Sequence, residues 1–358
     1  MAPSATDTET PMATKTSKFL KSTGSLDGFK YDDLTPVIGT EFPELNIVDD
    51  LLNSPDADRL IRDLAIKISE RGVVFFRAQD NLTNELQKRL IQRLGQLTTR
   101  PETHGLHIHP VLNDSREFGG ADAEVSAISS AQRSTLYKGT AYDQSAAVWH
   151  SDISFEVAPA DYSSLRLTQL PKTGGDTLWA SGCEMFDRIS KPYQKFLESL
   201  YATHAGVSFH AMAASKKFEF YTKERGSPLN FGTTLSATHP VIRTNPVTGW
   251  KSVFLLGTFP ADIHGLTRNE SEKLFNWFHE LLTYGHDLQC RFHWKNPNDL
   301  AIWDNRSNFH TATNDYQGLG DRYGNRVVGV GEKPFFDPES KSRREDLGTM
   351  DLMSPAHR

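Results

Sequence analysis

The chain has 358 residues, of which 37% are hydrophobic and 23% charged, a composition typical of a soluble globular protein that buries a sizeable core. The net charge of −6, with no basic stripe, argues against a nucleic-acid partner, and no segment approaches the roughly 20 apolar residues of a membrane span. The two cysteines, Cys183 and Cys290, lie far apart and in no metal-type spacing, which predicts a cytoplasmic protein without a disulfide framework.

The N-terminal part of the chain predicts a tail followed by helix and strand. Residues 1–28 are dominated by Ser, Thr, Ala, Pro and Lys and contain no apolar run, so we expect a disordered tail and no secretory signal. Apolar residues recur at helical spacing over residues 55–71. The run GVVFFR (72–77) predicts a buried strand, and a second amphipathic helix is expected over 84–96 with Thr83 as its N-cap.

The stretch VWHSDISFE (148–156) carries a histidine and an aspartate within a pattern typical of a strand. In a strand, His150 and Asp152 would share a face, roughly 6.6 Å apart. By themselves they are a hydrogen-bonded couple or two thirds of a metal site. His310 is a candidate third ligand, but it could equally be a surface residue, and spacing cannot choose among thirteen histidines.

The middle of the chain contains short strand-like runs separated by turn residues. GGDT (174–177), taken alone, predicts a Gly-Gly turn between strands. Residues 239–256, HPVIRTNPVTGWKSVFLL, predict a hairpin. Thr267 and Glu270 form a capping-box signature ahead of a helix that should end at Gly285.

Two further strands are expected at 300–304 (LAIWD) and 326–330 (RVVGV), and the polar tail 337–358 is expected to be loose. Arg322 and Arg326 are four residues apart, so in an extended chain both could face one cavity and bind an oxyanion, or both could be solvated at a strand edge. Many short strands with a few covering helices predict an α+β protein with a mainly β core, a sandwich or jelly roll rather than a doubly wound sheet.

Five segments occur in an order that is far more specific than any one of them. They are WHSDISF, PKTGGDTLW, HPVIRTNPVTGWKSVF, NDLAIWDNRSNFHTATNDY and GNRVVGVGEKPF. Together they resemble the taurine/2-oxoglutarate dioxygenase (TauD/TfdA-like) family, in particular its alkylsulfonate dioxygenases. The resemblance covers residues 29–336 and implies one domain with a double-stranded β-helix (jelly-roll, cupin-like) core and covering helices. It also implies Fe(II) as cofactor, with 2-oxoglutarate and O₂ as cosubstrates.

The resemblance assigns residues to the metal and to the cosubstrate. It implies that His150, Asp152 and His310 bind iron, that Thr177 donates a hydrogen bond to the distal carboxylate of 2-oxoglutarate, and that Arg322 pairs with this carboxylate. No catalytic residue beyond the metal centre is implied, because this chemistry requires no general base.

One part of this assignment has an alternative. The spacing from His310 to Arg322 is one residue longer than the family pattern, because the turn at 318–320 carries an insertion. A shifted alignment would exchange the roles of Arg322 and Arg326.

The resemblance also implies a substrate site. In LHIHP (106–110), His109 matches a sulfonate-binding histidine, and Arg326 matches a sulfonate-binding arginine. Ile153 and Phe259 are the other implied substrate contacts. Leu112 and Ala146 stand where the family's taurine enzyme presents polar groups to an amine, so an amine-free sulfonate is favoured over taurine.

The expected function is hydroxylation of a small anionic substrate. The leading candidate is an alkylsulfonate, oxidised at the carbon bearing sulfur and released as sulfite and an aldehyde, with succinate and CO₂ as coproducts. Alternatives within the family are aryloxyacetates, amino acids, purines and sulfate esters, and outside it a non-catalytic jelly-roll module that binds metal. No nucleic-acid or membrane partner is expected, and a homo-oligomer is left open.

Overall fold

The computed structural model describes residues 19–111, 113, 121–130, 148–216 and 219–349, and the structural statements below concern these residues. Its larger sheet has seven strands in the order β1-β2-β3-β13-β5-β15-β4, and all neighbours are antiparallel except β2 and β3. The strands are β1 (Asp32–Asp33), β2 (Thr40–Phe42), β3 (Val73–Phe76), β4 (Ser126–Ser129), β5 (Ala160–Gln169), β13 (Asp299–Asp304) and β15 (Tyr323–Val330). The late strand β13 is thus inserted between two strands from earlier parts of the chain.

A second sheet faces the first across an apolar core. It is antiparallel, in the order β12-β6-β14, with β6 (Thr177–Ser181), β12 (Gln289–Phe292) and β14 (Asn308–Ala312). Phe75 of β3 stacks on Phe292 of β12 with ring centroids 4.2 Å apart. Trp179 of β6 contacts Trp303 of β13, with centroids 5.7 Å apart. Aromatic rings from both sheets therefore fill the space between them.

Two smaller sheets complete the described strands. One is β11-β7-β8, with β7 (Tyr201–Ala205), β8 (Ser236–Pro240) and β11 (Pro260–Ile263). The other is the antiparallel pair β9 (Ile242–Thr244) and β10 (Lys251–Val253), which confirms the hairpin predicted from residues 239–256.

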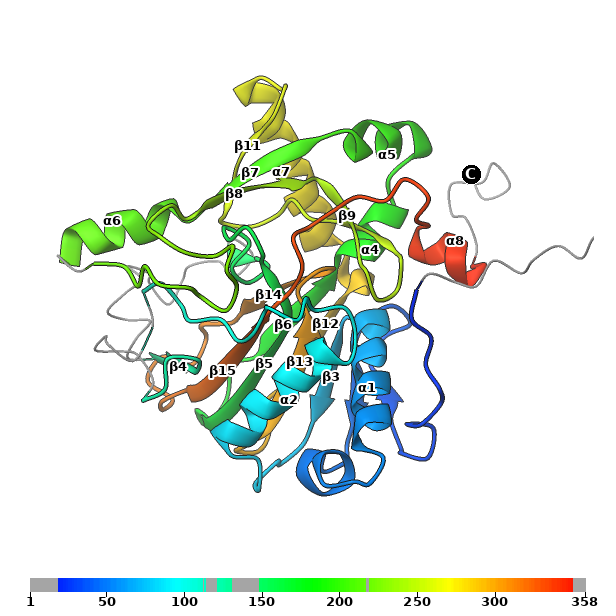
Figure 1. The fold of residues 1–358 in the computed structure, drawn as a ribbon, viewed down its shortest axis with the longest axis vertical. Helices are drawn as coiled ribbons and strands as arrows, with labels where there is room; N and C mark the ends of the chain where they lie inside the picture. The colour runs from blue at the N-terminus through cyan, green and yellow to red at the C-terminus, as the bar shows by residue number, and fades with distance from the viewer. Residues whose placement is uncertain (1–18, 112, 114–120, 131–147, 217–218, 350–358) are drawn as a thin grey trace, which may run out of the picture.

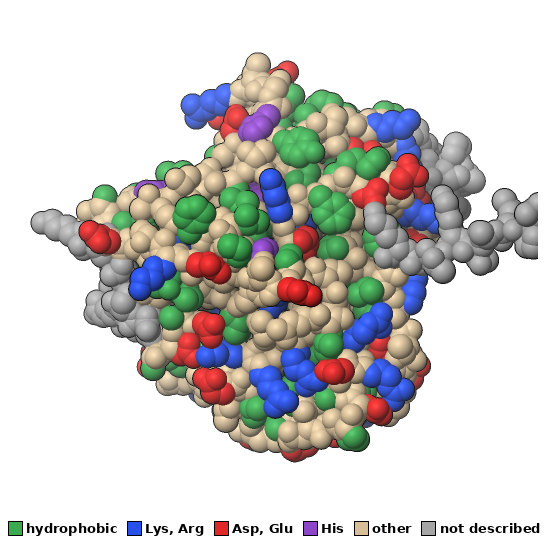
Figure 2. Space-filling model, in the orientation of Figure 1, with side chains coloured by type: hydrophobic (Ala, Val, Ile, Leu, Met, Phe, Trp, Pro, Cys, Tyr) green, Lys and Arg blue, Asp and Glu red, His purple; other side chains and the backbone are tan. Residues whose placement is uncertain are grey.

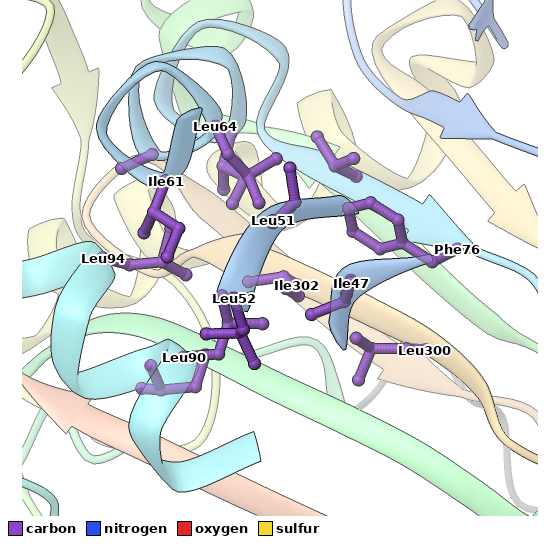
Figure 3. Packing of buried hydrophobic residues seen from close by; sticks show 14 of the residues in the cluster. Ile47, Leu51, Leu52, Ile61, Leu64, Phe76, Leu90, Leu94, Leu300 and Ile302 are labelled. Carbon is purple, nitrogen blue, oxygen red and sulfur yellow. The ribbon is translucent and has the colours of Figure 1, made fainter. Parts of the chain in front are cut away.

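Helices cover the outer face of the larger sheet (Figure 1). They are α1 (Ala57–Arg71), α2 (Asn84–Gln96) and the π-helix η1 (Ile47–Leu52). Figure 3 shows Leu51, Leu64 and Leu94 of these helices gathered over Phe76 and Ile302 of the sheet. The helical periodicity of residues 55–71 and 84–96 is confirmed, because the apolar stripe of each helix is the face that the sheet buries.

The remaining helices follow β6 in the chain. They are α4 (Gly182–Asp187), α5 (Lys191–Glu198), α6 (Val207–Lys216), α7 (Arg268–Tyr284), the 3-10 helix η3 (His286–Leu288) and α8 (Arg343–Leu347). The predicted caps are present: Thr83 accepts from the Leu86 N–H, and Thr267 and Glu270 form the capping box that begins α7. The protein is therefore mixed α+β with sheets at its centre, as expected.

The expectation that both tails are loose is wrong for the parts next to the domain. Residues 19–28 are held because the buried Asp63 carboxylate accepts from the hydroxyls of Thr23 (2.7 Å) and Ser25 (2.9 Å). At the other end, α8 has a capping box, and Arg344 forms an ion pair with the buried Glu184. Polar composition predicted disorder, but these polar groups are partners for buried carboxylates. Residues 1–18 and 350–358 lie outside the described residues.

Side chains of both charges are intermixed over the face shown in Figure 2. Within the described part of the chain, no helix is long and apolar enough to cross a membrane.

Candidate metal centre

Three side chains converge as a metal site requires. Nε2 of His150 and Nε2 of His310 each lie 3.9 Å from Oδ1 of Asp152, and the set offers one ligand atom per residue, all within 4.8 Å of one another. His310 lies on β14 and is tied to His150 by two backbone hydrogen bonds of 2.9 and 3.1 Å. Sequence spacing could not identify the third ligand. The backbone bridge between His150 and His310 is what places the His310 ring beside His150 and Asp152.

The predicted strand at 148–156 is wrong. His150 forms only an isolated bridge, and the chain turns immediately after it, with Ile153 at a φ of +46°. A positive φ is unfavourable for a β-branched residue, so no local preference in the sequence announces this turn. The turn is what brings the Asp152 carboxylate beside two imidazoles instead of along a flat strand face.

Buried polar groups hold this turn in place. His239 Nε2 lies 2.9 Å from the Ser154 carbonyl oxygen and 3.0 Å from that of Glu156, so its N–H is shared between the two carbonyls. His204 Nδ1 lies 3.0 Å from the Ser154 hydroxyl, and the Glu156 carboxylate accepts from Arg225 Nη2 at 2.8 Å. His239 belongs to the segment HPVIRTNPVTGWKSVF, and its hydrogen bonds support the turn that carries Asp152.

Each oxygen of the Asp152 carboxylate has its own environment. Ser163 donates to Oδ2 at 2.9 Å, and Asn305 in turn donates to the Ser163 hydroxyl at 2.8 Å. Asn305 also accepts the Asp152 N–H at 3.0 Å. Oδ1 faces the imidazoles and receives Arg326 Nη1 at 2.7 Å. The carboxylate is thereby fixed so that one oxygen is presented to a metal.

The charge states suit a divalent cation. Burial alone would raise the pKa of the Asp152 carboxyl, but Arg326, the two histidines and Ser163 outweigh burial and hold this pKa below its ordinary value. Burial lowers the pKa of His150 and lowers that of His310 to about 3, so both imidazoles are neutral at pH 7. His150 donates its Nδ1–H to the Val148 carbonyl at 2.8 Å, which leaves the Nε2 lone pair for a ligand. Two neutral imidazoles and one carboxylate fit Fe(II) with positions left open.

The GGDT segment, whose Thr177 begins β6, contacts Arg322 and forms a second polar site with it. Arg322 Nη2 lies 3.3 Å from the Thr177 hydroxyl oxygen, and Arg322 Nε donates to the Gly175 carbonyl at 2.9 Å. Gly175 has a φ of +72°, and a Cβ there would lie 2.9 Å from Cδ of Arg322. The Gly-Gly turn is present as predicted, and its second glycine makes room for the arginine.

The two arginines lie at different places. Arg322 contacts Thr177, whereas Arg326 contacts Asp152. Which arginine binds the cosubstrate, and therefore the alignment across the insertion at 318–320, stays a prediction. Both side chains are largely buried, so they are not the solvated pair at a strand edge.

The other predicted substrate residues lie along a row of rings that begins at the metal site. His150 contacts Phe259, with ring centroids 6.4 Å apart, and His109 contacts Phe209 at 5.1 Å. Ile153 packs in the same apolar cluster as Phe209 and Phe259. Leu112 and Ala146 lie outside the described residues.

Sequence reasoning missed several residues that shape the site. Ser163 and Asn305 orient the metal carboxylate, and Phe155 and Phe209 extend the apolar cluster. Asn305 lies within a segment used for the resemblance, which was a usable signal. Ser163 stands in a strand beside another serine, and no local pattern distinguishes the two.

Comparison with known proteins identifies relatives over nearly the whole chain. Residues 30–328 match the family described as Taurine catabolism dioxygenase TauD, TfdA family. The alpha-ketoglutarate-dependent dioxygenase btcD of Neocamarosporium betae is 50% identical over 91% of this chain and 97% of its own. The alpha-ketoglutarate-dependent sulfonate dioxygenase of Saccharomyces cerevisiae is 30% identical over 86% of this chain and 68% of its own.

Among solved structures, a taurine dioxygenase from Burkholderia xenovorans matches with a TM-score of 0.64 and 25% identity. The match covers 87% of this chain and 94% of that protein.

We predict that Asp152→Ala abolishes Fe(II) binding and substrate-coupled turnover, because it removes the anionic ligand. His150→Ala and His310→Ala should do nearly the same, and Ser163→Ala should weaken Fe(II) by about 10–100-fold, as is usual when a ligand loses its orienting partner. Anaerobic Fe(II) titration measures this. Asp262→Ala, an exposed carboxylate on β11, is the control. All variants should stay folded because apolar burial stabilises the sheets. Wild-type turnover by Asp152→Ala would show that the ligand assignment is wrong.

A second prediction concerns acid stability. Burial, followed by the charge of Arg243, lowers the pKa of His239 from 6.5 to about 4. The unfolded chain therefore binds this proton first as pH falls, and the metal-free protein should lose stability between pH 6.5 and pH 4, by about 3 kcal/mol from this residue. Urea unfolding at several pH values measures the slope. His239→Gln keeps an N–H donor that does not titrate, so its slope should be shallower; an unchanged slope would contradict the prediction.

Proposed function

Because this chain belongs to the taurine catabolism dioxygenase TauD, TfdA family and is a 2-oxoglutarate-dependent dioxygenase, we propose that it hydroxylates a small anion held by Arg326 and His109. The leading substrate is an alkylsulfonate. Bound iron would activate O₂ with the decarboxylation of 2-oxoglutarate to succinate and CO₂. Hydroxylation at the carbon bearing sulfur would give a product that collapses to sulfite and an aldehyde. The yeast relative, described as a sulfonate dioxygenase, supports this substrate class.

The observation that carries the proposal is the position of Arg326. Its Nη1 lies 2.7 Å from the metal carboxylate, and its Nε is buried without a hydrogen-bond partner among the described residues. A buried donor that lacks a partner destabilises the protein, and an anion beside the metal would satisfy it. Arginine is suited to this role because its charge is permanent and its N–H groups match the oxygens of a sulfonate or carboxylate.

His109 would supply a neutral donor to the same anion. Its Nδ1 accepts the Val111 N–H at 3.1 Å, so the ring proton is on Nε2. Burial, followed by the charges of His107 and Arg326, holds the pKa of His109 well below its ordinary value. The ring therefore remains a neutral N–H donor at pH 7 and needs no counter-ion of its own.

The apolar surroundings suit a substrate without an ammonium group. Phe155, Phe209 and Phe259 contact one another with ring centroids 5.1–6.1 Å apart, and Ile153 packs in the same cluster. An ammonium group buried against these rings without a partner would cost several kcal/mol. This supports an alkylsulfonate over taurine. The same donors would also accept a carboxylate or a sulfate ester, and these are the alternatives that the substrate test separates.

The cosubstrate site is proposed at Thr177 and Arg322. Both side chains are almost fully buried and together offer a hydroxyl and a guanidinium to the distal carboxylate of 2-oxoglutarate. The two facing sheets that carry these residues are consistent with the double-stranded β-helix expected from the family.

This assignment predicts that replacing Arg322 and replacing Arg326 weaken 2-oxoglutarate binding to different extents. Arg322→Ala should weaken 2-oxoglutarate by about 100-fold or more, since losing one member of a buried ion pair typically costs about 3–5 kcal/mol. Arg326→Ala should change 2-oxoglutarate affinity much less. The measurement is anaerobic titration of the visible charge-transfer band of the Fe(II)–2-oxoglutarate chelate. If Arg326→Ala were the variant that lost 2-oxoglutarate, the two roles would be exchanged.

The substrate class is tested on matched sulfonates, carboxylates and sulfate esters, with sulfite, sulfate and succinate measured together. Amine-free alkylsulfonates should give a higher kcat/KM than taurine. Arg326→Ala and His109→Ala should each raise the KM for the sulfonate more than that for 2-oxoglutarate, and should increase succinate formed without product. Coupled succinate from a carboxylate, with no sulfite from any sulfonate, would reject the sulfonate assignment.

A further inference from the structure

Thr177, the proposed hydroxyl for 2-oxoglutarate, already receives two hydrogen bonds from the protein. Trp294 Nε1–H lies 3.2 Å from its oxygen, and Arg322 Nη2 lies 3.3 Å from it. A hydroxyl oxygen has two lone pairs and one hydrogen. Both lone pairs of Thr177 are therefore used by donors, and its own hydrogen must point away from both of them.

We propose that Trp294 is a positioning residue for the cosubstrate: its indole N–H fixes the Thr177 hydroxyl as a donor toward the distal carboxylate of 2-oxoglutarate. This inference rests on the proposed cosubstrate site. Without Trp294, the hydroxyl could turn its hydrogen elsewhere, and a lone pair could face the carboxylate and repel it. A hydroxyl that accepts hydrogen bonds is also a better donor, because hydrogen bonds in a chain polarise one another.

The indole is well placed to hold this geometry. Trp294 is 5% exposed, and its ring meets Phe292 edge-on with centroids 4.9 Å apart. Phe292 is paired with Thr177 in the register of β12 and β6, and it stacks on Phe75 of the larger sheet. The backbone that follows is fixed too, since the Lys295 N–H donates to Asp299 at 2.9 Å. Neither partner of the Trp294–Thr177 contact is on a free loop.

The proposal makes a prediction that depends on the ligand. Thr177 serves only the distal carboxylate, so loss of the Trp294 N–H should matter for 2-oxoglutarate and not for a 2-oxo acid that lacks this carboxylate. Trp294→Phe removes the N–H and keeps an aromatic ring. We expect about five-fold weaker binding of 2-oxoglutarate, the usual size for one hydrogen bond, and unchanged binding of 2-oxopentanoate.

The experiment is an anaerobic titration of the Fe(II) protein with each 2-oxo acid, followed by the charge-transfer band. Variants are Trp294→Phe, Thr177→Val and the double variant. The control is Trp250→Phe, which also removes one indole N–H. This N–H donates to Asp346 at 3.0 Å and not to Thr177, so its loss should leave the affinity for 2-oxoglutarate unchanged. Since Thr177→Val already lacks the hydroxyl, adding Trp294→Phe to it should change 2-oxoglutarate affinity less than two-fold.

The ratio of the two affinities is measured on folded protein, so it remains readable if Trp294→Phe is partly unstable. Trp294→His, which can keep an N–H, is the second variant. Its ratio of 2-oxoglutarate affinity to 2-oxopentanoate affinity should be closer to the wild-type ratio than that of Trp294→Phe. Equal weakening of both acids would show a packing role and overturn the inference, as would no weakening or full additivity with Thr177→Val. If Arg322→Ala left 2-oxoglutarate binding unchanged, the proposed cosubstrate site itself would be wrong, and the inference would fall with it.

Discussion

The buried charge of Asp152 sets the requirements for the residues around it. A carboxylate without partners would be protonated or would destabilise the fold, and here Ser163 and Arg326 supply those partners, while Asn305 donates to the Ser163 hydroxyl. Because both imidazoles are neutral, Arg326 is the cation that balances Asp152 before any metal arrives. With Fe(II) and doubly charged 2-oxoglutarate added, the formal charges of these groups and Arg322 leave one positive charge. A singly charged anionic substrate would cancel it.

The geometry around this charge depends on contacts that are distant in sequence. The turn after Asp152 places Ile153 at a positive φ, and His239 from β8 keeps the turn closed by sharing one N–H between two carbonyls. In the GGDT segment, Gly175 has a positive φ and no side chain, which leaves space for Arg322 to donate to its carbonyl. In both places a backbone conformation with positive φ is held by a buried side chain from a distant part of the sequence.

Sequence patterns predicted the helices, because a helix depends mainly on residues that are close together in the sequence. Apolar periodicity and caps gave the helices at 57–71, 84–96 and 268–284 to within a few residues, because these depend on neighbours three or four positions apart. The turn at Ile153 was missed because its causes are His239 and Asn305, far along the chain.

The same distinction holds at the site. The order of five segments pointed to His150, Asp152 and His310, which do converge. Ser163 and Trp294 could not be found in this way, since no sequence pattern marks their hydrogen bonds to Asp152 and Thr177. Polar composition also misled at the tails, where Thr23 and Arg344 are anchored to buried carboxylates.

The place of β13 in the larger sheet has a consequence for synthesis of the protein on the ribosome. β13 lies between β3 and β5, yet it is made more than a hundred residues after either of them. Until residue 304 has emerged, β3 and β5 each lack β13, the strand that pairs with both of them, so backbone N–H and C=O groups on these edges are unpaired, and loop closure over such a distance is slow. The nascent chain therefore passes through a long interval in which it is prone to aggregate, and we expect its yield to depend on chaperones and on the rate of translation.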